Sequence, residues 1–75
     1  MNEQLKRAIA NELRVDPAQL TADRALYDLE NWDSVMVLVL MMLLSQSVGK
    51  EILPEEMGAL RTFGDIESLV ASKQS

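Results

Sequence analysis

Residues 31–48 read NWDSVMVLVLMMLLSQSV, and this stretch decides the fold of the chain. Val35 to Leu44 is a run of ten apolar residues, too short to span a bilayer, which takes about 20 residues. Leucine and methionine outnumber valine in the run, and residues 45–48 continue a helical face, so the run predicts a helix rather than a buried strand. We expect this helix over residues 34–48, ending at Gly49, with one core stripe of Val37, Leu40, Met41, Leu44 and Val48.

Helical spacing on either side of this stretch predicts three further helices. Residues 3–14 place Leu5, Ile9 and Leu13 on one face, with Asn2 as N-cap. Pro54 opens a short helix over residues 54–60. Thr62 and Asp65 form a capping box for a last helix over residues 63–72, and residues 72–75 are expected to fray.

A long connection over residues 15–33 separates the first two helices. Asp16-Pro17 ends the first helix and is suited to capping a short new turn. Leu20, Leu26 and Leu29 are expected to pin the connection to the core. The sequence therefore predicts one all-α domain over residues 1–75, a small four-helix bundle with three longer helices and a short third one.

The composition excludes several classes of function. The 75 residues contain no histidine and no cysteine, which excludes zinc or thiolate chemistry and a Ser-His-Asp triad within the chain. Seven scattered basic residues form no patch for nucleic acid, and the net charge of −5 favours a protein partner with a basic docking face. The polar N-terminal segment lacks the apolar run of a signal peptide, so we expect a cytoplasmic protein without a membrane span.

Ser34 is the residue best placed to hold a chemical group. It follows Asp33 at the expected start of a helix, where free backbone N–H groups and the helix dipole favour a phosphate. The alternative is that Ser34 is a plain helix cap, since serine and aspartate are both common N-cap residues.

The whole chain resembles the acyl carrier protein family, which includes peptidyl and D-alanyl carriers. Asp33-Ser34-Val35 matches the family's Asp-Ser-aliphatic triplet at the start of the second helix, and Thr62-Phe63 matches the start of its fourth helix. The resemblance implies that a phosphopantetheinyl transferase attaches 4′-phosphopantetheine from coenzyme A to Ser34, and that Asp33 helps to position the transferase and its magnesium-bound coenzyme A. The arm would then hold cargo as a thioester, without a catalytic site or a metal site in the chain itself.

Two departures from the family's pattern bear on partners. The segment Asp28-Leu29-Glu30-Asn31-Trp32-Asp33-Ser34 is one residue longer than the common Asp-Leu-Gly-X-Asp-Ser and lacks its glycine, and it resembles stand-alone carriers of specialised pathways. The outward positions of the second helix are apolar or uncharged rather than acidic. We therefore expect partly hydrophobic docking through Trp32, Val35, Met36, Val39 and Met42, with acidic contributions from Asp28, Glu30 and Asp33 before the helix and Glu51, Glu55 and Glu56 after it.

Trp32 and the methionines have alternative interpretations. Trp32 either plugs the end of the bundle or contacts the arm or a partner. Met36, Met41, Met42 and Met57 are adaptable core residues or, alternatively, the lining of a cargo cleft.

The predicted function is an acyl carrier that meets acyl-loading and acyl-processing enzymes, as a monomer or with weak self-association. An aminoacyl or peptidyl carrier would use the same arm. A different class is an unmodified helical interaction module, which would dock through the apolar face of the second helix and tolerate loss of Ser34.

Overall fold

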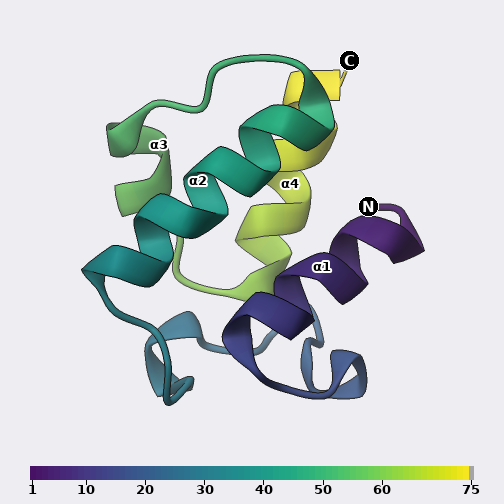
Figure 1. Ribbon diagram of the computed structural model, residues 1–75, viewed down its shortest axis with the longest axis vertical. Coiled ribbons are helices and arrows are strands. Elements are labelled where there is room, and N and C mark those ends of the chain that lie inside the picture. The colour runs from purple at the N-terminus through teal and green to yellow at the C-terminus, as the bar shows by residue number, and fades with distance from the viewer. Residues whose placement is uncertain (75) are drawn as a thin grey trace.

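The computed structural model describes residues 1–74, which form four α-helices and no β-strand (Figure 1). The helices are α1 (Glu3–Leu13), α2 (Ser34–Val48), α3 (Pro54–Gly58) and α4 (Phe63–Gln74). In Figure 1, α2 crosses in front of α4. The whole of the long connection between α1 and α2 lies at one end of the bundle. This arrangement confirms the predicted small all-α bundle with a short third helix.

The first helix begins as expected but ends one residue earlier. Asn2 caps it, since the Oδ1 atom accepts a hydrogen bond of 2.7 Å from the Leu5 N–H. Arg14 was expected in the helix but is its C-cap, with a left-handed φ of 59°. Its N–H donates to the carbonyls of Ala10 and Asn11, which satisfies acceptors that the helix end leaves without partners.

The second helix directs part of its apolar run into the core. Leu40 and Leu44 are fully buried, while Val37, Met41 and Val48 are half-buried and pack against the core. Gly49 ends the helix at a φ of 70°, where its N–H donates to the Ser45 carbonyl. A left-handed glycine at this position is a common helix stop. No helix in the described part of the chain is long and apolar enough to cross a membrane.

The third helix is shorter than expected and the fourth is longer. A turn follows α3, in which the Leu60 N–H donates to the Met57 carbonyl. The expectation that residues 72–74 fray is wrong, because α4 continues to Gln74. Lys73 in its last turn forms an ion pair of 3.0 Å with Glu56 of α3, and this contact gives the helix end a tertiary partner. Ser75, the last residue of the expected tail, lies outside the described residues.

The long connection is fixed to the bundle by apolar and backbone contacts. Leu20, Leu26 and Leu29 are buried in the core, as expected. The connection contains two short 3₁₀ turns, η1 (Pro17–Gln19), capped by Asp16, and η2 (Leu26–Asp28). Its backbone also bonds to the start of α4, with Phe63 donating to the Arg24 carbonyl at 2.9 Å. The segment that leads into α2 is therefore an ordered part of the fold.

Candidate functional site

Ser34 is the first residue of α2 and is exposed. The residue before it, Asp33, is the N-cap, and its Oδ1 atom accepts a hydrogen bond of 2.8 Å from the Met36 N–H. The alternative in which Ser34 caps the helix is therefore wrong, because Asp33 takes that role. The Ser34 side chain makes no hydrogen bond within residues 1–74, so its hydroxyl stands free at the helix start.

The other described serine and threonine hydroxyl groups are placed differently. Thr21 donates to Asp23 at 2.7 Å, and Thr62 accepts the Asp65 N–H in the capping box of α4. The remaining described serines lie beyond the first turn of their helices, away from a helix N-terminus: Ser45 and Ser47 in α2, and Ser68 and Ser72 in α4. Among the described serines, Ser34 alone begins a helix, which is the position that favours a phosphate group.

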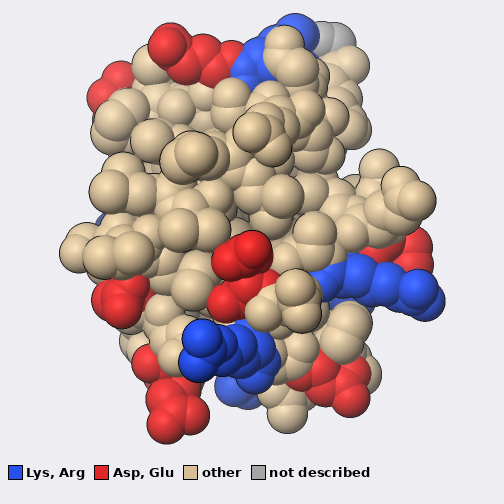
Figure 2. All heavy atoms as spheres, viewed as in Figure 1, with Lys and Arg blue, Asp and Glu red and all other residues tan. Residues whose placement is uncertain are grey.

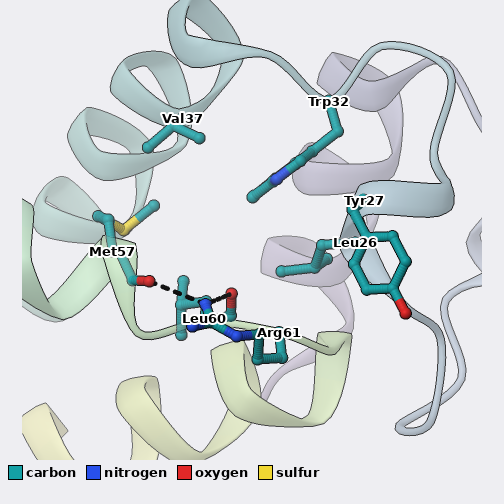
Figure 3. A pocket seen from close by; sticks show the side chains of 8 residues that line it. Leu26, Tyr27, Trp32, Val37, Met57, Leu60 and Arg61 are labelled. Carbon is teal, nitrogen blue, oxygen red and sulfur yellow. Dashed lines mark hydrogen bonds between the residues drawn. The ribbon is translucent and has the colours of Figure 1, made fainter.

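An apolar pocket of about 410 Å³ lies on one side of the start of α2 (Figure 3). Trp32 from the connection, Val37 from α2 and Met57 from α3 line it, and Figure 3 shows the Trp32 ring extending between the two helices and the connection. The Tyr27 ring turns outward and is 72% exposed. Arg61 closes part of the rim, where its Nη1 atom donates to the Gly58 carbonyl at 3.0 Å. Trp32 is thus both packed against the core and part of a pocket wall.

A second pocket, of about 400 Å³, lies between the end of α1 and the start of α2. Its lining is largely polar and consists of Asn11, Glu12, Arg14, Asn31, Asp33, Val35 and Met36. Asn31 also joins the two elements, since its Nδ2 atom donates to the Leu13 carbonyl at 2.9 Å. The segment that precedes Ser34 is therefore held against the end of α1 by a hydrogen bond three residues before the serine.

The acidic residues that were expected to face partners differ in their exposure to solvent. Asp28, Glu30, Asp33 and Glu55 are exposed. Glu56 is half-buried and already engaged, because its Oε1 atom accepts the Leu53 N–H at 2.9 Å and pairs with Lys73. The Leu53 N–H, followed by the Lys73 ammonium, lowers the pKa of Glu56 below its ordinary value. Glu56 therefore serves the junction of α3 and α4.

The apolar residues of α2 that were expected to face partners also differ in their exposure. Val35 and Met42 are exposed, whereas Met36 and Val39 are half-buried. Leu38 and Tyr27 are exposed as well, although the sequence did not predict either as a surface residue. The spacing of Leu38 from Val35 and Met42 is itself helical, but an uninterrupted apolar run contains no polar residue to mark the outward face.

The methionines do not gather in one cleft. Met57 is buried and lines the apolar pocket, while Met36 lines the polar one. Met41 is half-buried against the core, and Met42 is exposed rather than a core residue.

Comparison with known proteins identifies the class to which this fold and site belong. The model of the family described as "Phosphopantetheine attachment site" matches residues 3–70, so the chain belongs to this family, the acyl carrier proteins. "Acyl carrier protein 2" of Ralstonia nicotianae (strain ATCC BAA-1114 / GMI1000) is 30% identical to the chain over 70 residues, covering 93% of this chain and 86% of that protein.

Membership implies a covalently attached 4′-phosphopantetheine as cofactor and a carrier function. The described residues fit such a group, because the free Ser34 hydroxyl at the start of α2 provides an accessible oxygen for a phosphodiester. Acyl carrier proteins work with acyl-handling enzymes and are carriers rather than catalysts.

Proposed function

We propose that Ser34 carries the 4′-phosphopantetheine arm and that the chain delivers thioester-bound acyl groups to successive enzymes. The observation that supports this most directly is the exposed hydroxyl on the first residue of α2, with the capping role already filled by Asp33. When attached, the arm supplies the thiol that this cysteine-free chain lacks.

The start of α2 suits a phosphodiester. Its first N–H groups, on Ser34 and Val35, have no intrahelical acceptor, because the first N–H groups of any helix lack one. They and the helix dipole favour the negative charge of a phosphate. The Asp33 carboxylate uses Oδ1 for the Met36 N–H, and we assign it the further role of positioning the transferase and its magnesium-bound coenzyme A.

The proposal extends to the type of cargo and to the pathway in which the carrier works. The segment Trp32-Asp33-Ser34 supports a stand-alone carrier of a specialised biosynthetic pathway with acyl cargo. An aminoacyl or peptidyl cargo would use the same serine and the same arm. A cytoplasmic location stays a prediction.

Intact-protein mass spectrometry tests the assignment of Ser34. The apo protein is incubated with coenzyme A, magnesium and a broad-specificity phosphopantetheinyl transferase. We expect the wild type and Ser68→Ala to gain one phosphopantetheine, and Ser34→Ala to remain folded and gain none. Modification of Ser34→Ala would refute the assignment. A folded wild type that gains nothing would favour the unmodified interaction module. Incubating the holo protein with acyl-loading or aminoacyl-loading enzymes then distinguishes the two types of cargo.

A further inference from the structure

The polar pocket between the end of α1 and the start of α2 lies directly beside Ser34. Asp33 and Val35, the residues immediately before and after the serine, both line it. Its volume of about 400 Å³ lies within the range of small-molecule sites, roughly 300–1,000 Å³. A group attached to Ser34 therefore begins at the edge of this pocket.

Arg14 is the only cation among the residues that line the polar pocket. It is exposed, and its guanidinium makes no ion pair or hydrogen bond within residues 1–74. The lining also contains the carboxylates of Glu12 and Asp33, and neither is paired with Arg14. The described chain therefore leaves one free positive charge in a pocket that is otherwise neutral or acidic. Figure 2 shows basic side chains next to acidic ones on the face of the molecule below α2.

The backbone of Arg14 has a conformation that favours glycine. Its φ of 59° is left-handed, and no other non-glycine residue of the described chain has a positive φ. The Arg14 N–H donates to the Asn11 carbonyl and the Val15 N–H to the Ala10 carbonyl, a pattern of helix ends in which glycine is the most common residue at this position. The end of α1 therefore requires only the backbone of residue 14 and does not explain an arginine side chain.

Attachment of the arm changes the charge around this pocket. A phosphodiester on Ser34 adds a negative charge next to Asp33, whose Oδ1 atom is already engaged by the Met36 N–H. Arginine binds phosphate oxygens through paired, charge-assisted hydrogen bonds, which are stronger than those between neutral groups. Arg14 is the residue of the lining that can oppose the added charge.

We infer that Arg14 binds the phosphodiester of the arm and holds the first part of the arm in the polar pocket. This inference rests on the proposed function. In the apo protein the guanidinium is free. In the holo protein it joins the end of α1 to the modified start of α2, so the holo form gains stability through this contact.

Thermal unfolding of the apo and holo forms tests the inference. The quantity compared is the modification shift, the Tm of the holo form minus the Tm of the apo form, because the effect of a substitution on folding itself cancels in it. We expect the modification shift of the wild type to exceed that of Arg14→Gln by about 2 °C or more. Intact-protein mass confirms that each sample is fully apo or fully holo.

Arg7→Gln is the matched control. Arg7 is also exposed and lies two turns earlier on α1, where its ion pair of 3.9 Å with Glu3 is remote from the pocket lining. This variant loses the same charge, and its modification shift should agree with that of the wild type within about 1 °C.

Arg14→Gly separates the side chain from the backbone. Glycine accepts the left-handed conformation without strain, so the apo form of this variant should melt at or above the Tm of the apo wild type. Its modification shift should nevertheless match that of Arg14→Gln, because the guanidinium is absent from both. A modification shift equal to that of the wild type would mean that Arg14 serves only the helix end and would overturn the inference.

NMR of the arginine side chains supplies an independent readout. The Nε–H signal of Arg14 should move when the arm is attached, while that of Arg7 stays in place. Equal modification shifts in the wild type and Arg14→Gln, or an unmoved Arg14 signal, would overturn the inference while leaving the assignment of Ser34 intact. Failure of the wild type to be modified at all would instead refute the proposed function, and the inference with it.

Discussion

The Asn31 side chain donates a hydrogen bond of 2.9 Å to the carbonyl of Leu13, 18 residues earlier in the chain. This bond joins the segment before Ser34 to the last residue of α1, at a helix end where carbonyls lack intrahelical partners. The bond therefore holds the segment before α2 against α1. Asp33, the N-cap, holds the same segment to the first turn of α2 by accepting the Met36 N–H.

Replacing Asn31 with alanine should weaken this anchor. We expect the free energy of unfolding to fall by about 1 kcal/mol, the usual net contribution of one such hydrogen bond. Urea denaturation measures the change, and Asn11→Ala is the control, because the Asn11 side chain is exposed and makes no hydrogen bond within residues 1–74. Equal stability of Asn31→Ala and the wild type would show that the bond does not anchor the segment.

Two glycines offer a matched test of the contact between the connection and α4. A Cβ atom at Gly64 would lie 2.7 Å from the carbonyl oxygen of Ala22, which accepts the Gly64 N–H, whereas a Cβ atom at Gly58 meets nothing within 4 Å. Gly64→Ala should cost about 1–3 kcal/mol, since backbone must shift to accept it. Gly58→Ala should be neutral or stabilise by up to about 1 kcal/mol. Thermal and urea unfolding of the pair measure both effects, and an equally small change in the two would contradict this packing.

The capping box of α4 should make stability depend on pH in the acid range. The N–H groups of Arg61 and Thr62 both donate to the Asp65 Oδ2 atom, at 2.8 and 3.1 Å, and they lower the pKa of this carboxyl below its ordinary value of 3.8. A lowered pKa stabilises the folded state at pH values above the ordinary one, and this contribution is lost as the pH falls through the folded value. The free energy of unfolding should therefore decline below about pH 4.

Asp65→Asn keeps an acceptor but removes the titrating charge, so its stability should decline less steeply than that of the wild type. Urea denaturation at a series of pH values between about 6 and 2.5 measures the two slopes. Parallel curves for the two proteins would show that Asp65 does not contribute to the acid dependence.

Local signals in the sequence predicted most of the fold. Asn2, Asp16, Gly49 and the pair Thr62 and Asp65 each have the capping role expected of them, because a cap depends on a few neighbouring residues. The end of α4 was mispredicted since it rests on a tertiary ion pair between Lys73 and Glu56, which sequence spacing does not reveal.

The candidate site was predictable in its centre and less so in its surroundings. The position of Ser34 follows from the helix start alone. The division of the apolar run into buried Leu40 and exposed Leu38 depends on how the neighbouring helices cover α2, and the bond from Asn31 to Leu13 depends on the path of the connection. These features needed the structure.

The most direct test of the central claim is to locate the arm within the holo protein by peptide mass spectrometry. Trypsin should release residues 25–50, a peptide that contains Ser34, Ser45 and Ser47, and fragmentation distinguishes the three serines. We predict one phosphopantetheine, attached to Ser34. An arm on Ser45, on Ser47 or on any other peptide would contradict it.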